Sequence, residues 1–135
     1  MLYGYSDLIM QGALVTLELA IASLVFSVVL GLVGASAKIS GGAVLRKLVT
    51  AYTTLIRGVP DLVLMLLIFY GLQMVLNRLT DMMEFEQINI DPMLAGILTL
   101  GFIYGAYFTE TFRGAWLAVP PGQIEAAKAF GFSPL

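Results

Sequence analysis

Residues 19–37 read LAIASLVFSVVLGLVGASA, a run of nineteen residues without a charge. Wound into an α-helix at a rise of 1.5 Å per residue, this run is about 28 Å long, close to the ~30 Å thickness of the hydrocarbon layer of a membrane. The apolar character extends back to Ala13 and is interrupted only by Glu18. We therefore expect a membrane-spanning helix over residues 13–37.

Two further apolar runs follow, over residues 58–77 and 92–113. The chain as a whole is 59% hydrophobic and only 12% charged, whereas a soluble domain carries roughly 25% charged residues. A very apolar buried core is the alternative, but it would need long amphipathic partners to cover it. The runs and the composition predict an all-α integral membrane protein, with one transmembrane domain over residues 1–135.

The residue types that the sequence lacks exclude most catalytic chemistry. There is no Cys and no His, so a disulfide framework and a thiol nucleophile are excluded, and the commonest zinc ligand and general base are missing. The sequence also has no Gly-rich phosphate-binding loop, so it is not expected to bind ATP. We expect no catalytic residue, no metal site and no cofactor, and therefore a protein that is not an enzyme.

Charges in the two segments between the spans predict the orientation. Residues 38–57 carry four Lys or Arg and no acidic residue, whereas residues 78–91 carry one Arg and four Asp or Glu. Short loops rich in Lys and Arg stay in the cytoplasm. The N-terminus is therefore expected outside, and the residues that follow the third span are expected inside.

Several charged residues lie at the ends of the predicted helices. Apolar residues recur every three or four positions over residues 44–56, which predicts an amphipathic helix at the membrane interface. The next helix is expected to start near Asp61, whose carboxylate suits a helix N-terminus, or else Asp61 pairs with Arg57. Glu110 and Arg113 are expected to pair across one turn. Facing a cationic substrate is the second interpretation for Glu110.

Small residues four positions apart indicate where helices can approach closely. Gly31 and Ala35 share one face of the first span, and Gly101 and Gly105 share one face of the third. Such pairs let another helix come into backbone contact. We expect both faces to be helix-packing surfaces.

The segment 119–131 reads VPPGQIEAAKAFG and follows the third span directly. Its prolines are expected to end that span, residues 123–130 to form a short helix, and Gly131 to stop it. A helix of about two turns is marginal by itself in water. It therefore needs a surface on which to dock.

The pattern Gly122-Gln-x-Glu125-Ala126-Ala127-x-x-x-Gly131 resembles the EAA loop of the permease subunits of bacterial ABC importers. The resemblance implies that this segment is a cytoplasmic coupling helix that fits a groove on an ATPase. Glu125 would be the docking anchor, Ala126 and Ala127 would keep the helix thin, and Gly122 and Gly131 would bound it.

Residues 57–60 (RGVP) and 110–114 (ETFRG) resemble the polar amino acid uptake branch of these permeases, and the whole chain is similar to their Q-type subunits for histidine, lysine, arginine and ornithine. The resemblance implies a type I ABC importer transmembrane domain with a MetI-like fold, of which three of about five transmembrane helices are present. It also implies that an Ile-x-Leu-Pro element and two spans follow Leu135. We therefore expect the chain to be a piece of a longer permease.

The resemblance also implies the setting in which the protein works. The expected location is the bacterial inner membrane, with the N-terminus in the periplasm. The expected partners are a cytoplasmic ABC ATPase dimer that hydrolyses the ATP, a second permease subunit of M type, a periplasmic substrate-binding protein, the lipid bilayer and an amino acid substrate, and no nucleic acid.

Other functions are compatible with the same sequence. Within the family, the substrate could be arginine, an opine or another polar amino acid. Outside the family, a membrane scaffold without transport activity or a fragment of an ion-driven transporter would also have three spans. An ion-driven transporter needs carboxylates deep in the bilayer, whereas Glu18, Asp61 and Glu110 all lie near the ends of the predicted spans.

Overall fold

The structure is a computed structural model that describes residues 4–82 and 91–132. This part of the chain forms five α-helices, which are α1 (Ser6–Ser40), α2 (Ala43–Arg57), α3 (Asp61–Met82), α4 (Pro92–Leu117) and α5 (Pro121–Ala129). Three of them, α1, α3 and α4, are long and apolar enough to cross a membrane by length and composition. The prediction of an all-α chain with three candidate spans is confirmed.

The helices differ from the apolar runs at their ends. α1 and α4 continue beyond residues 37 and 113, because helical hydrogen bonding does not stop where the apolar residues stop. α3 starts at Asp61 and not at residue 58, because residues 58–60 form the turn that separates it from α2. Asp91 caps α4, since its side chain accepts a hydrogen bond of 2.8 Å from the Leu94 backbone N–H.

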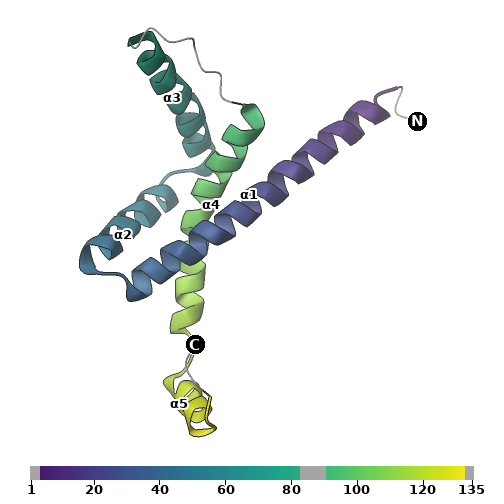
Figure 1. Ribbon diagram of the computed structural model, residues 1–135. Helices are drawn as coiled ribbons and strands as arrows, with labels where there is room; N and C mark the ends of the chain where they lie inside the picture. The colour runs from purple at the N-terminus through teal and green to yellow at the C-terminus, as the bar shows by residue number, and fades with distance from the viewer. Residues whose placement is uncertain (1–3, 83–90, 133–135) are drawn as a thin grey trace.

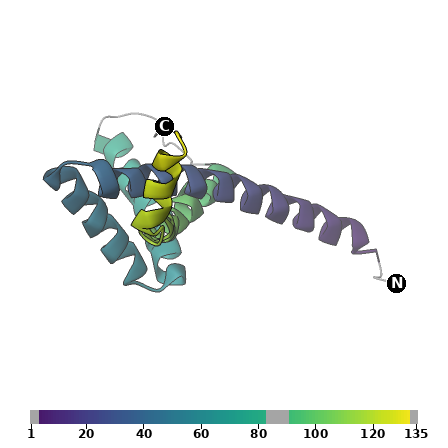
Figure 2. The ribbon, with the colours of Figure 1, turned by 90° about the horizontal axis from the view of Figure 1, so that it is seen from below.

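α4 is the central helix of the molecule. It packs against α1, α2 and α3, and α1 crosses it obliquely (Figure 1). The view from below shows α1 and α2 diverging around the end of α4 (Figure 2). α5 stands apart, beyond the last turn of α4 (Figure 1).

Glycines let α1 and α4 come into contact where they cross. A Cβ atom added to Gly31 of α1 would collide with the Phe108 side chain and lie 3.1 Å from the Phe108 backbone carbon, and a Cβ on Gly105 of α4 would lie 2.7 Å from Leu30 Cδ2. A Cβ atom added to Gly34 would likewise collide with Thr109, and one added to Gly101 would collide with Phe26. The predicted packing faces are therefore confirmed, and Gly34 extends the first of them.

Polar side chains inside the two crossing helices are satisfied by their own backbone. Ser27 donates a hydrogen bond of 2.8 Å to the Leu24 carbonyl, and Thr109 donates one of 2.8 Å to the Gly105 carbonyl. Both side chains are buried. Because hydrocarbon offers no hydrogen-bond partner, such internal bonds are what a spanning helix requires of its Ser and Thr residues.

α2 docks on α4 through one aromatic side chain. The Tyr52 hydroxyl donates a hydrogen bond to the Phe102 carbonyl, and the two rings lie 4.8 Å apart between centroids. Burial raises the pKa of Tyr52 to about 12, so the phenol keeps the proton that it donates. The amphipathic helix expected over residues 44–56 is thus present and packed against the third span.

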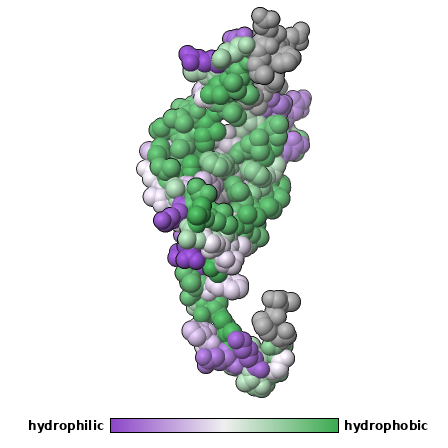
Figure 3. Space-filling view, turned by 60° about the vertical axis from the view of Figure 1, so that its left-hand side comes forward, coloured by the Kyte–Doolittle hydropathy of each residue, from purple (hydrophilic) through white to green (hydrophobic). Residues whose placement is uncertain are grey.

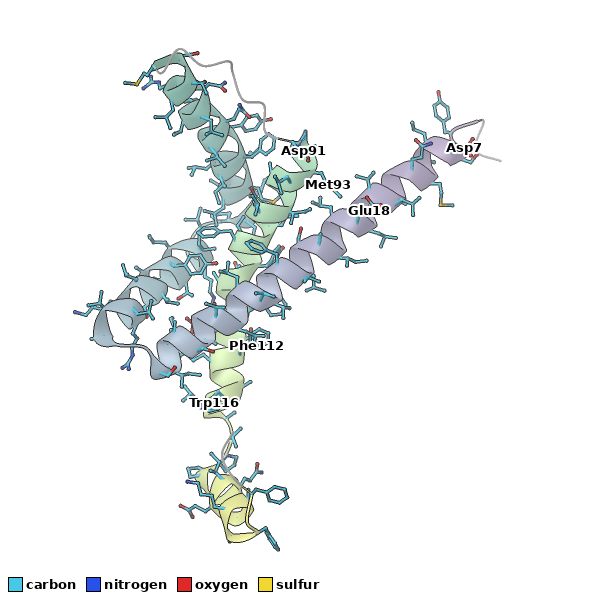
Figure 4. The ribbon with its side chains drawn as sticks, in the orientation of Figure 1. Asp7, Glu18, Asp91, Met93, Phe112 and Trp116 are labelled. Atoms are coloured by element: carbon cyan, nitrogen blue, oxygen red, sulfur yellow. The ribbon has the colours of Figure 1, made fainter. Side chains whose placement is uncertain are left out.

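The surface is consistent with a membrane setting. Hydrophobic residues cover most of the middle of the face in Figure 3, and hydrophilic residues gather toward its two ends. Asp7 and Asp91 lie at the end opposite to Trp116 and α5 (Figure 4). Glu84 and Glu86, which contributed to the predicted orientation, lie outside the described residues.

Replacing Gly31 by Ala should destabilise the crossing of α1 and α4. The new methyl group meets the Phe108 backbone, and forcing extra atoms into a packed contact costs about 1–3 kcal/mol. Thermal unfolding of the chain in detergent, followed by circular dichroism, measures the effect. Gly12→Ala on the same helix is the matched control, because nothing lies within 4 Å of a Cβ at Gly12. Equal stability of the two variants would contradict the role assigned to Gly31.

Candidate functional site

α5 presents nearly all of its surface to its surroundings. None of its residues is buried, and Glu125 and Ala126 are exposed whereas Ala127 is partly covered. Ile124 and Phe130 have exposed fractions of 49% and 84%. The four predicted coupling residues on this helix therefore lie together, in a position that leaves them free to meet a partner.

The C-terminus of α5 is closed by a glycine turn. Gly131 has a φ of +84°, a left-handed conformation that side chains other than glycine rarely adopt. Its N–H donates to the Lys128 carbonyl, and the Phe132 N–H donates to the Ala127 carbonyl, both at 3.0 Å. These two bonds form the Schellman motif, so the predicted stop at Gly131 is confirmed. Gly122, by contrast, lies in open space at the start of the helix.

A second group of polar residues lines a cavity of about 710 Å³ between α1, α2 and α4. Arg57, Glu110 and Arg113 of the predicted set line it, and Asp61 lies beside it. The cavity is lined by the C-terminal end of α1, by α2 and by the C-terminal half of α4. Its full lining is Lys38, Arg46, Thr50, Thr53, Thr54, Arg57, Gly58, Tyr107, Glu110 and Arg113.

Lys38 is the residue of this cavity that the sequence analysis missed. Its ammonium group pairs with Glu110 Oε1 and donates a hydrogen bond of 2.8 Å to Thr53 Oγ1, so it connects α1, α2 and α4. The predicted partner of Glu110, Arg113, is also present but lies farther away, at 3.7 Å. A signal was available, because Lys38 is seven positions after Gly31 and thus shares the packing face of α1.

The predicted pair of Arg57 and Asp61 does not form. The two residues belong to different helices, α2 and α3, so the spacing of four positions does not bring them together. Instead, Tyr107 lies between them. Its hydroxyl donates a hydrogen bond of 3.1 Å to Asp61 Oδ1, and the Arg57 guanidinium carbon lies 5.7 Å from the centre of its ring. Tyr107 therefore ties both helices to α4, and the sequence interpretation of an ion pair was wrong.

The side chains that line this cavity can hold helices together and can bind a small molecule. Among the described residues they show no catalytic geometry. The one carboxylate of the cavity, Glu110, is already occupied by two cations. Elsewhere in the described residues, no group of three or more His, Cys, Asp or Glu is placed to hold a metal ion.

Known proteins resemble this chain over most of its length. The histidine/lysine/arginine/ornithine transport system permease protein HisQ of Salmonella typhimurium is 68% identical, over 98% of this chain and 58% of HisQ. The nopaline transport system permease protein NocQ of Agrobacterium fabrum is 40% identical, over 97% of this chain and 56% of NocQ. The chain thus spans little more than half the length of these relatives.

A solved structure supports the same relationship. The chain matches a protein described as an amino acid ABC transporter with histidines, with a TM-score of 0.75 and 32% sequence identity, over 96% of this chain and 55% of that one. The resemblance inferred from the sequence motifs is confirmed. Residues 27–135 also match the sequence profile of a family of transport proteins. The chain belongs to that family, the inner membrane components of binding-protein-dependent transport systems.

Proposed function

We propose that this chain is part of a permease subunit of an ATP-driven importer for histidine or basic amino acids. The observation that carries the proposal is the 68% identity to HisQ over 98% of the chain. The three apolar helices would form part of the wall of the translocation path. The chain itself would not hydrolyse ATP, which is the task of a partner subunit.

The proposal includes a topology and a set of partners. The cationic segment 38–57 favours a cytoplasmic location, which would put the N-terminus in the periplasm and α5 in the cytoplasm. On that side α5 would meet an ABC ATPase dimer. A second permease subunit of M type would pack beside the spans, and a periplasmic binding protein would deliver the amino acid from the other side.

The exposed position of α5 supports its role as the coupling helix. A helix of nine residues without a buried side chain is marginal by itself and would be held mainly by what it docks on. Glu125 would accept hydrogen bonds or pair with cations on the ATPase, and Ala126 and Ala127 would let the helix enter a groove. Movement of the ATPase subunits would then shift α4, to which α5 is joined directly, and rock the spans between two states.

Another substrate within the same family is the second candidate. The 40% identity to a nopaline permease supports transport of an opine, a derivative of a basic amino acid. The higher identity to the histidine and lysine permease favours the first candidate. The two candidates share the fold and the coupling helix and differ only in the cargo.

Uptake measurements in membrane vesicles test the proposed function. Vesicles that contain the full permease with this chain, its ATPase and its binding protein should accumulate radiolabelled histidine, lysine or arginine in the presence of ATP, and nopaline less. Uptake that survives ATP depletion and collapses with the proton gradient would overturn the proposal.

Glu110→Gln should leave the preference among these substrates unchanged, since Lys38 and Arg113 occupy that carboxylate.

Changing Glu125 to Gln should weaken the link between ATP hydrolysis and uptake. Loss of a charge-assisted contact is expected to reduce ATPase association roughly tenfold, as hydrogen bonds to charged groups contribute about 1.5–3 kcal/mol. Co-purification of the ATPase measures association, and uptake per ATP hydrolysed measures coupling. Gln123→Lys changes the net charge of the same helix by the same amount, +1, and is the matched control. Wild-type coupling in Glu125→Gln would remove this residue from the docking surface.

Changing Gly131 to Val should also impair docking, through the backbone. A left-handed conformation costs a residue with a Cβ roughly 1–2 kcal/mol, so the turn after α5 would open. Gly131→Asn is the control, since Asn tolerates this conformation. We expect normal membrane insertion for both variants and reduced ATPase association for Val alone. Equal association of the two variants would show that the turn has no part in docking.

A further inference from the structure

The cavity between α1, α2 and α4 is unusually rich in positive charge. Among its described lining residues, four are cationic and only Glu110 is anionic. Hydroxyl groups of three Thr residues and one Tyr complete the polar wall. A volume of about 710 Å³ lies within the range of roughly 300–1,000 Å³ that is usual for small-molecule sites. The cavity is therefore large enough for a ligand, and its charge favours an anion.

Two of the four cationic side chains in the cavity form no ion pair with another described residue. Lys38 and Arg113 share the Glu110 carboxylate. Arg46 makes only a hydrogen bond of 3.4 Å to the Gly41 carbonyl, and Arg57 lies over the ring of Tyr107. Within the described residues, neither of these two guanidinium groups forms an ion pair, and both residues are exposed. They are available to a ligand.

The cavity lies at the level at which the spans end. Lys38 is in the last turn of α1, and Arg113 is close to the end of α4. The side of α2 opposite to the cavity carries Val44, Leu48 and Leu55, which are 74%, 64% and 69% exposed. A helix with one exposed apolar side and one basic side lies in the boundary between acyl chains and headgroups. The cavity therefore opens at the depth of lipid phosphates.

We propose that this cavity binds the phosphate headgroup of an anionic phospholipid. Arg57 would donate charge-assisted hydrogen bonds to the phosphate oxygens, a geometry that suits a guanidinium group. Arg46, eleven positions earlier on α2, would add positive charge to the same cavity. Thr54, whose hydroxyl makes no hydrogen bond to another described residue, would add a donor. Basic pockets between membrane helices on the cytoplasmic side are suited to anionic headgroups. The acyl chains would lie on the apolar surface of α1 and α2. The site is separate from the coupling helix and adds a lipid ligand to the proposed transport function.

The charge of the cavity argues against a cationic occupant. A lysine or arginine side chain of a transported amino acid would meet three more positive charges than negative ones. A phosphodiester, with one negative charge and no cationic group of its own in phosphatidylglycerol, fits the same surroundings. Phosphatidylcholine carries an added ammonium group. It therefore serves as the control lipid that the cavity should not prefer.

Native mass spectrometry of the full chain in mild detergent, with phosphatidylglycerol or phosphatidylcholine added, tests the proposal. The wild-type chain should retain phosphatidylglycerol in preference to phosphatidylcholine. Arg46→Gln and Arg57→Gln should each weaken retention of phosphatidylglycerol roughly fivefold, as one Lys or Arg near anionic lipid contributes about 1 kcal/mol. Arg46→Lys should restore most of it.

Lys47→Gln is the matched control, because Lys47 is the neighbour of Arg46 on α2 and does not line the cavity. This variant should bind phosphatidylglycerol as the wild type does. Equal loss in Lys47→Gln and Arg46→Gln would mean a diffuse surface charge and would overturn the proposal, as would equal retention of the two lipids. Displacement of phosphatidylglycerol by millimolar inorganic phosphate would assign the cavity to a free anion and overturn the proposal of a lipid ligand. Circular dichroism of each variant verifies that its helices remain formed.

Discussion

The close crossing of α1 and α4 is the contact on which the rest of this structure depends. In a membrane, helices gain little from burying apolar surface, because lipid is as apolar as their side chains, so association relies on close packing and on polar links. Gly31 and Gly105 supply the close packing. Lys38 and Glu110 supply a polar link at one end of the same interface. Because α1 packs on α4 far more extensively than α2 or α3 does, loss of this crossing would remove most of the packing around α4.

Polar links at one end of the bundle determine how α2 and α3 are placed. Lys38 reaches both Glu110 and Thr53, and Tyr107 reaches Asp61 while its ring supports Arg57. Three of these four links involve α4 and the fourth joins α1 to α2, so the turn between α2 and α3 is held without an ion pair across the turn itself. The same links gather cationic side chains around one cavity. The polar links that pack the helices together thus also form the proposed binding cavity.

Much of this organisation could be predicted from sequence, because it depends on local properties. Apolar run length predicts α1, α3 and α4, and the left-handed turn at Gly131 follows from a glycine after a short helical pattern. The contact of Lys38 with Glu110 could not be predicted in the same way, since 72 positions separate the two residues. The charge of Lys38 was interpreted as a loop charge that sets orientation. The Arg57 and Asp61 pair failed for a related reason, because spacing is informative only within one helix.

The properties of α5 explain why its sequence is so different from that of the spans. Its ends are fixed locally, by the proline at its start and by the Schellman turn at Gly131, but no packing of its sides holds it. Burying Ile124 and Phe130 in a partner would contribute about 1.5–3 kcal/mol for each side chain, which offsets part of the conformational entropy lost when so short a helix is ordered. Larger residues at Ala126 and Ala127 would strengthen the apolar surface but would widen the helix. A helix that enters a groove on a partner, as we propose for α5, is better served by small side chains and a few exposed anchors.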